Sequence, residues 1–245
     1  MKKTIFAAAL IFSVCGFIYS DGAAAFSRDE LTGRVDPSKN AAFAVIPSKY
    51  ASQKGFWMRR EALDAFVRMH DAAAKDGVSL VIVSAFRSFD DQKGIWDAKW
   101  SGERLVEGKN LAKTVKDPVE RARTILRFSS MPSTSRHHWG TDVDLNALED
   151  SYFLKGKGKA EFDWLTKNAA AYGFARSYTK KGADRPTGYE EEKWHWSYLP
   201  LSRPMLAAWL SNVTAADMRG FSGSDTVGAL NIVRDYVGGV DGSCR

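Results

Sequence analysis

Cysteine and histidine are both scarce in this sequence of 245 residues, which has two of the former and four of the latter. Cys15 lies in the amino-terminal segment and Cys244 lies one residue before the end. If the amino-terminal segment is removed, Cys244 remains alone and an internal disulfide is impossible, even in a compartment that permits one. A structural zinc site, which typically takes several thiolates, is disfavoured for the same reason.

Long apolar runs are also scarce, and the one at residues 5–19 follows Lys2 and Lys3 and precedes the small residues 23–25. This order is typical of a secretory signal peptide and predicts one over residues 1–25, cleaved after Ala25. The run is shorter than the ~20 residues that span a bilayer, so an uncleaved membrane anchor is the weaker alternative. We therefore expect a periplasmic or secreted protein with no stable membrane span after cleavage.

The net charge of +6 is a mild basic excess, and loss of two lysines and one aspartate with the signal peptide leaves +5. Such a charge favours approach to an anionic polymer such as the cell wall, or to an acidic lipid surface. No nucleic-acid motif accompanies it, so we expect no nucleic-acid partner. A composition of 44% hydrophobic and 26% charged residues suits a globular domain of ordinary type, which we expect to be a monomer.

Three of the four histidines lie in two short segments rich in acids. Residues 135–144 read Ser-Arg-His-His-Trp-Gly-Thr-Asp-Val-Asp, and residues 190–196 read Glu-Glu-Glu-Lys-Trp-His-Trp. Two imidazoles and one carboxylate would leave the fourth position of a tetrahedral zinc open to water, which is typical of a catalytic site. The glutamates before His195 can supply the further carboxylate that takes a proton from the bound water.

These segments resemble the motifs of a known enzyme family. Ser135-x-His137-x-x-Gly140-x-x-x-Asp144, followed by Glu192-x-x-His195, is similar to the zinc D-alanyl-D-alanine carboxypeptidases of the VanY and VanX type, a group that includes L,D-carboxypeptidases and phage endolysins. Residues 84–92, Ser-Ala-Phe-Arg-Ser-Phe-Asp-Asp-Gln, resemble the upstream Ser-Gly-Tyr-Arg-Ser-x-x-x-Gln segment of that family. The three motifs extend from Ser84 to Tyr198, in the family's order.

The resemblance implies a role for each matched residue. It makes His137, Asp144 and His195 the ligands of one zinc ion, Glu192 the general base, and Arg87 the group that polarises the scissile carbonyl. Ser135, Ser88 and Gln92 are the predicted substrate-binding residues. The alternatives are a hydroxyl bonded to nearby backbone for Ser135 and a brace of the loop for Gln92.

The sequence departs from the family at two positions. The family commonly has alanine in place of Asp142 and proline in place of Lys193. Residues two apart in a strand point to the same face, so periodicity alone leaves open whether Asp142 or Asp144 would bind the metal, and only the family spacing selects Asp144.

The local pattern around the motifs predicts how they are presented. The apolar run 78–85 favours a buried strand that ends at Arg87. A straight strand over 137–144 would place His137 and Asp144 on opposite faces, so we expect a bend at Gly140, with His137 in a loop and a strand over 141–145. His138 should then point away from the metal, packing on Trp139 or facing solvent.

Further elements are expected at fixed places along the chain. Helices are predicted for residues 56–76, with His70 as a partly exposed helix residue, and for 89–100, 118–127, 160–172, 205–218 and 224–237. A strand expected over 194–199 presents His195 between two core tryptophans, with Glu192 on the curved segment that leads into it. Residues 101–114 are polar and basic and are expected to lie on the surface.

Helices first, then strands mingled with helices, indicate an α+β fold. The resemblance implies a small central antiparallel sheet flanked by helices, the LAS-type zinc peptidase fold. We expect an irregular lead-in over 26–55, a zinc peptidase domain over 56–200 and a helical extension over 201–245 that packs on it.

The expected activity is removal of the terminal D-alanine from a peptidoglycan stem peptide. L,D-carboxypeptidase or murein endopeptidase activity at the same site is an alternative, and so is an inactive zinc-containing module that binds the cell wall.

Overall fold

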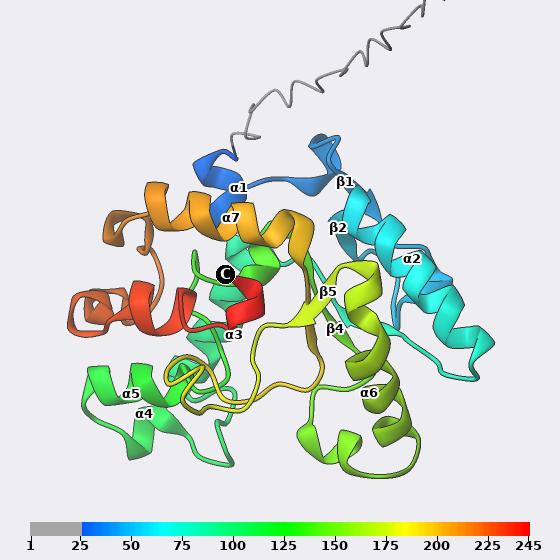
Figure 1. Ribbon diagram of the computed structural model, residues 1–245. Coiled ribbons are helices and arrows are strands. Elements are labelled where there is room, and N and C mark those ends of the chain that lie inside the picture. The colour runs from blue at the N-terminus through cyan, green and yellow to red at the C-terminus, as the bar shows by residue number, and fades with distance from the viewer. Residues whose placement is uncertain (1–25) are drawn as a thin grey trace, which may run out of the picture.

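The computed structural model describes residues 26–245 (Figure 1). The predicted signal peptide, with Cys15 and the cleavage site, lies outside these residues. Within the described part of the chain, no helix is both long enough and apolar enough to cross a membrane.

An antiparallel sheet of four strands forms the centre of the molecule, in the order β3-β4-β6-β5. Its strands are short: β3 is Ile82–Ser84, β4 is Asp142–Leu145, β5 is Phe174–Arg176 and β6 is His195–Tyr198. A separate two-stranded ribbon pairs β1, Phe43–Val45, with β2, Trp57–Arg59. The structure thus confirms the expected α+β class and the small antiparallel sheet.

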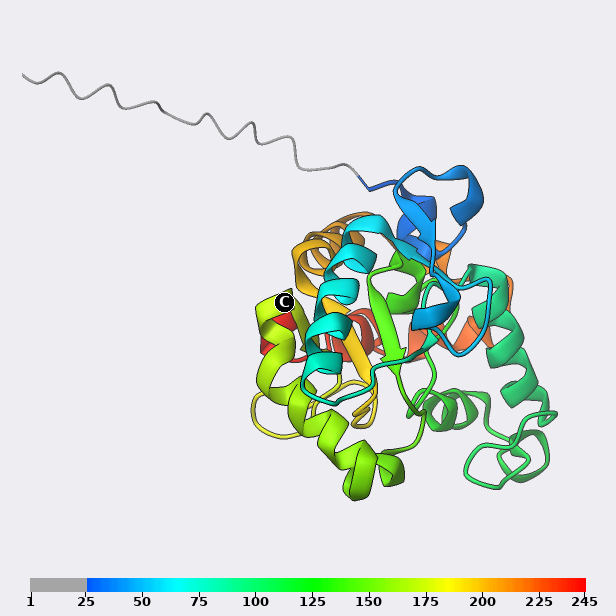
Figure 2. The ribbon, with the colours of Figure 1, turned by 90° about the vertical axis from the view of Figure 1, so that its right-hand side faces the viewer.

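Helices surround the sheet on both sides (Figures 1 and 2). Their bounds are α1 Arg28–Thr32, α2 Arg60–Lys75, α3 Phe89–Ser101, α4 Leu111–Thr114, α5 Pro118–Ile125, α6 Gly156–Asn168 and α7 Leu199–Asn212. Asp117 caps α5 through hydrogen bonds from the Val119 and Glu120 amides, as its sequence signature predicts. His70 lies near the end of α2 and is partly exposed, as expected.

Two hydrophobic clusters lie beneath these helices. One holds α2 and α6 against the sheet through residues such as Phe66, Leu165 and Trp196. The other joins α1, α3, α5, α7 and the carboxy-terminal segment around Trp96 and Trp209, and it includes the buried Cys244. Segments from both ends of the chain therefore share a core with the helix that follows Arg87.

Two expectations about the ends of the molecule are corrected. Residues 26–55 are not irregular: they contain α1, capped by Ser27, and strand β1, which were missed because both elements are too short to show a period. The first closing helix begins at Leu199 rather than at residue 205, with Pro200 tolerated in its first turn. The second expected helix is a 3₁₀ segment, Ser224–Ala229, followed by a π-helical segment, Ile232–Val237.

The predicted strand 78–85 is also shorter than expected. Only residues 82–84 form the strand, with Ile82 opposite Leu145 and Ser84 opposite Asp144 of β4. Ahead of them, the Asn146 side chain accepts from the Val81 amide and donates to the Ser79 carbonyl, in place of a neighbouring strand.

Candidate active site

His137, Asp144 and His195 come together in the structure. One ligand atom from each residue lies within 4.8 Å of the others, and all three side chains are buried. In the β4–β6 ladder Asp144 is directly opposite His195, so strand register alone brings these two together. His137 enters from the 3₁₀ turn η3, Arg136–Trp139, and its Nε2 lies 3.3 Å from Oδ2 of Asp144.

Gly140 supplies the bend between His137 and Asp144. Its φ is +68°, a left-handed conformation that glycine adopts without steric cost. The surroundings leave no room for a side chain, because a Cβ at this position would lie 2.4 Å from Cε1 of Phe43. The β1–β2 ribbon fixes the turn further, since the Arg59 amide donates to the Gly140 carbonyl (2.8 Å).

The two histidines are oriented by hydrogen bonds on the side away from the cluster. Nδ1 of His137 donates to the Ala85 carbonyl (2.8 Å), which leaves its Nε2 free as a ligand. Nε2 of His195 lies 2.9 Å from Oδ2 of Asp142, and its Nδ1 faces Asp144 at 3.1 Å. Partners of this kind orient the histidines of metal sites.

Asp142, left open by periodicity, therefore lies behind His195 instead of in the cluster. This fully buried carboxylate also accepts from Arg136 Nε (2.8 Å), from the Thr141 hydroxyl (2.7 Å) and from the Ser197 hydroxyl (2.8 Å). Burial alone would raise the pKa of Asp142, but Arg136 and His195 hold it below its usual value.

The donor set fits a metal cation. For His195, burial would lower the pKa, but the carboxylates of Asp142 and Asp144 raise it to about 9. These carboxylates thus favour a positive charge at the cluster, which a cation between the three donors would provide. Two imidazole nitrogens and a carboxylate oxygen suit zinc.

Glu192 is buried beside the cluster, with Oε2 3.7 Å from Nδ1 of His195. Burial raises the pKa of Glu192 to about 7, with His195 lowering it and Asp144 raising it further. As expected, it lies on the lead-in to β6, and the bond from its amide to the Tyr178 carbonyl (3.0 Å) holds it there. Its neighbour Glu191 instead forms ion pairs with Arg176 and Lys193.

Arg87 follows β3 and reaches the same cavity. It donates through Nη1 to Gln92 (2.7 Å) and through Nη2 to the Ser84 hydroxyl (2.9 Å), and Nη2 lies 4.0 Å from Oδ2 of Asp144. Gln92 is fully buried, and its Nε2 donates to the Ser130 carbonyl (2.7 Å). Both ends of the Gln92 amide are therefore engaged inside the protein, which corresponds to the bracing alternative.

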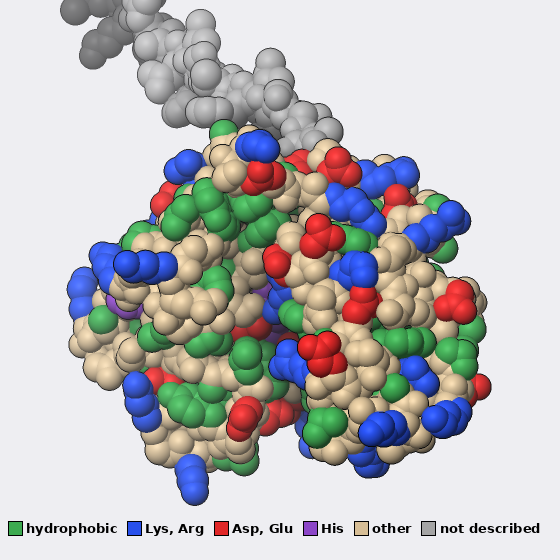
Figure 3. Space-filling model, turned by 180° about the vertical axis from the view of Figure 1, so that it is seen from behind, with side chains coloured by type: hydrophobic (Ala, Val, Ile, Leu, Met, Phe, Trp, Pro, Cys, Tyr) green, Lys and Arg blue, Asp and Glu red, His purple; other side chains and the backbone are tan. Residues whose placement is uncertain are grey.

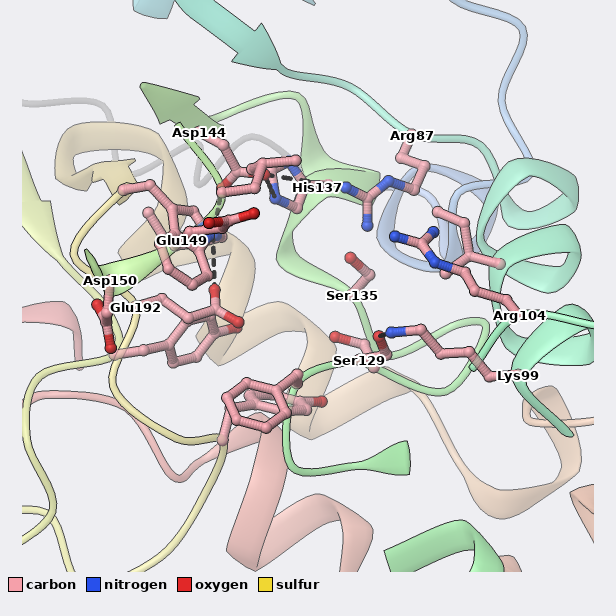
Figure 4. A pocket seen from close by; sticks show the side chains of 18 residues that line it. Arg87, Lys99, Arg104, Ser129, Ser135, His137, Asp144, Glu149, Asp150 and Glu192 are labelled. Atoms are coloured by element: carbon pink, nitrogen blue, oxygen red, sulfur yellow. Dashed lines mark hydrogen bonds and ion pairs between the residues drawn. The ribbon is translucent and has the colours of Figure 1, made fainter. Parts of the chain in front are cut away.

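Ser88 and Ser135, the other predicted substrate contacts, have different places. Ser88 caps α3: its hydroxyl donates to Asp91 Oδ2 (2.6 Å) and accepts from the Asp91 amide (3.1 Å). It lines a smaller neighbouring cavity instead of the one that holds the cluster. Ser135 does line the cluster's cavity, on the wall between Arg87 and Ser129 (Figure 4).

His138 and Trp194 differ from expectation. His138 neither faces solvent nor merely packs on Trp139: it is fully buried, its Nδ1 donates to the Arg87 carbonyl (2.7 Å) and its Nε2 accepts from the Ser133 amide (3.1 Å). Burial lowers the pKa of His138 to about 3, so it ties the Arg87 loop as a neutral ring. Trp194 is only partly buried and lines the cavity, whereas Trp196 is in the core as expected.

The cavity around the cluster has a volume of about 520 Å³ and opens as a cleft with acidic and histidine side chains at its floor (Figure 3). Figure 4 shows two differently charged sides. Glu192, Glu149 and Asp150 lie on one side, and Arg87, Arg104 and Lys99 lie on the other. The sequence motifs did not reveal Lys99 or Arg104, which lie beyond the last matched residue of their segment.

Fold and site together are typical of a hydrolase: a buried triad that could hold a metal ion and a carboxylate share one cleft. Comparison with known families gives the assignment: the model of the VanY family, D-alanyl-D-alanine carboxypeptidase, matches residues 55–201. The chain belongs to this family of metallopeptidases. This confirms the family resemblance seen in the motifs.

Individual proteins show the same likeness. YodJ of Bacillus subtilis (strain 168), named as a carboxypeptidase, is 33% identical over 176 residues, which are 69% of this chain and 56% of YodJ. The chain spans about half the length of the curated relatives it matches.

Similar solved structures include two with a TM-score of 0.48. The LD-carboxypeptidase LdcB is 30% identical, covering 65% of this chain and 68% of its own. A vancomycin-resistance D,D-pentapeptidase VanY, in complex with Zn(II), is 26% identical, covering 67% of this chain and 88% of its own.

Proposed function

We propose that this protein is a zinc-dependent D,D-carboxypeptidase that removes the terminal D-alanine from peptidoglycan stem peptides. The observation that carries the proposal is the buried Glu192 carboxylate beside the His137, Asp144 and His195 cluster, on the wall of an open cavity. Membership of the D-alanyl-D-alanine carboxypeptidase family supports the substrate class.

His137 Nε2, an oxygen of Asp144 and His195 Nδ1 would hold the zinc ion. When bound, zinc would act as a Lewis acid on the scissile carbonyl and lower the pKa of a coordinated water. The fixed tautomer of His137 and the Asp142 contact of His195 keep the ligand nitrogens directed at the cluster before any ion arrives.

Glu192 takes the proton of the attacking water on its carboxylate and then returns it to the leaving amine. A hydrogen bond from its backbone amide to the Tyr178 carbonyl anchors Glu192 in the lead-in to β6, with its carboxylate beside His195. Arg87 lies near Asp144, on the side of the cavity opposite Glu192. Its positive charge there stabilises the negative charge that develops on the carbonyl oxygen. Gln92, Ser84 and His138 fix the position of Arg87.

Peptidoglycan as substrate agrees with the expected export of the chain, and we propose a periplasmic or secreted location for the mature protein. The L,D-carboxypeptidase, endopeptidase and inactive-module alternatives share this site, and they differ in the products that they predict.

The test is mass spectrometry of muropeptides incubated with the mature protein, with and without a chelator. Chelator-sensitive loss of one D-alanine from pentapeptide stems is the expected result. Loss only from tetrapeptides would assign the L,D activity, and cleavage of crosslinked stems would assign an endopeptidase. Absence of any product from protein that holds zinc would refute the proposal.

A paired substitution tests the role of Glu192. Glu192→Gln should lower kcat by ~10²–10⁴-fold, because the amide cannot accept the proton, while zinc content stays unchanged. Glu191→Gln is the matched control, since Glu191 is adjacent in sequence but forms ion pairs with Arg176 and Lys193 instead of facing the cluster. Equal activities of the two variants would contradict the assignment.

A further inference from the structure

Lys99 and Arg104, on the cavity wall, have no anionic partner within residues 26–245. Lys99 and Arg104 both line the cavity on the same side as Arg87 (Figure 4). Among residues 26–245, no carboxylate oxygen lies within 4.0 Å of the charged nitrogens of either residue. The side-chain partner of Lys99 is the neutral hydroxyl of Ser129, to which Nζ donates.

The fold directs both side chains to this place. On α3, Ile95 and Lys99 are four residues apart, and so share the helix face that meets the cavity. The helix ends at Gly102, which adopts a left-handed φ of +81°. The chain then turns back, with the Arg104 amide donating to the Ala98 carbonyl (2.8 Å), and Arg104 lies beside the end of α3.

Their proximity is electrostatically unfavourable without an anion. Burial, Arg104 and Arg87 all lower the pKa of Lys99, to about 8, and Glu192 opposes them. Arg87 is already engaged by Gln92 and by Ser84. The cavity thus keeps two further cations free to bind a ligand, at a place where an anion would relieve their repulsion.

We propose that Lys99 and Arg104 form a subsite that binds the free carboxylate of the leaving residue. This inference rests on the proposed function and names the feature that would make it a carboxypeptidase. A substrate whose chain continues past the scissile bond as an amide brings no negative charge to this subsite. Binding of such an amide substrate would leave Lys99 and Arg104 without a partner. The subsite therefore favours substrates that end in a free carboxylate over peptides that continue past the scissile bond.

The test compares two substrates that differ only at the end. Diacetyl-L-Lys-D-Ala-D-Ala and its carboxy-terminal amide are turned over by zinc-loaded wild type, Lys99→Met, Arg104→Met and the double variant, and the ratio of kcat/KM for acid over amide is measured. Lys113→Met, an exposed lysine of α4 outside the cavity, is the control. Binding of the acid is measured in parallel by calorimetry with metal-free protein.

We expect the double variant to lose at least ~10-fold in this ratio, because hydrogen bonds to charged groups are strong, with the loss mainly in KM and with matching loss of calorimetric affinity. Lys113→Met should keep the wild-type ratio. An unchanged ratio in the double variant, with both substrates still cleaved, would overturn the subsite and leave the proposed function standing. Failure of wild type to bind or cleave the acid would overturn both. The single variant Arg104→Met is the one expected to fold normally. Within residues 26–245 the only hydrogen bond of Arg104 is made by its backbone amide, which the substitution retains.

Discussion

Replacing Gly140 by alanine tests whether the bend between His137 and Asp144 depends on glycine. Two costs follow from the structure. A left-handed backbone costs an L-residue ~1–2 kcal/mol, and Gly140 has a φ of +68°. The new Cβ would also lie 2.4 Å from Cε1 of Phe43, and such overpacking typically costs ~1–3 kcal/mol.

The sum predicts a loss of ~2–5 kcal/mol in the free energy of unfolding, which lowers Tm by ~4–20 °C in a chain of this size. Gly77→Ala is the matched control, because Gly77 has a φ of +74° but nothing within 4 Å of a Cβ. It should show the backbone cost alone. Phe43→Leu introduced together with Gly140→Ala should recover part of the difference.

Thermal unfolding followed by circular dichroism measures the stabilities, and competition with a chromogenic chelator measures zinc affinity. Because Gly140 sets the position of His137 relative to Asp144, Gly140→Ala should also weaken zinc binding, whereas Gly77→Ala should not. If the two variants had the same Tm and the same zinc affinity, the assignment of the bend to Gly140 would be wrong.

Three further predictions concern the charges of the site. Asp142→Asn should destabilise the fold by ~3–5 kcal/mol in urea unfolding, because it leaves the buried Arg136 without a counter-charge. It should also weaken zinc binding by ~10–100-fold through His195, and wild-type affinity would count against the orienting role of Asp142. The KM for an acid-terminated substrate should rise as pH rises through about 8, where Lys99 loses its proton and its positive charge, while Lys99→Arg should flatten this rise. Chelation should lower Tm and re-addition of zinc should restore it, since an ion that binds the native state stabilises it; a Tm that chelator leaves unchanged would argue against a bound metal.

The site was predictable from sequence where its geometry follows from local features. Gly140 was identified because His137 and Asp144 are separated by an odd number of residues, which would place them on opposite faces of a straight strand, and the structure contains the bend. Asp142 was not resolved in the same way. Strand periodicity places it on the same face as Asp144, and only the packing of Arg136 and Ser197 around it shows that it contacts His195 from behind.

Features that depend on tertiary contacts were missed or wrong. The burial of His138 arises from contacts with loops distant in sequence, which no local pattern encodes. Lys99 is one of many lysines, and its place on the cavity wall depends on how α3 packs. At the carboxy terminus, an apolar pattern with helical spacing predicted an α-helix, but the structure has a 3₁₀ and a π segment. Packing on the core determines which type of helical turn forms there.

The pairing of Asp144 with His195 closes a loop of 51 residues that includes α6 and β5. Closing a loop of this length costs ~3–4 kcal/mol of chain entropy, which must be offset before the ligands meet. Helix α6 and the turn into β5 involve near neighbours and can form earlier. The triad is therefore a late product of folding, and an ion that binds there is expected to slow unfolding much more than it speeds the search for the native state.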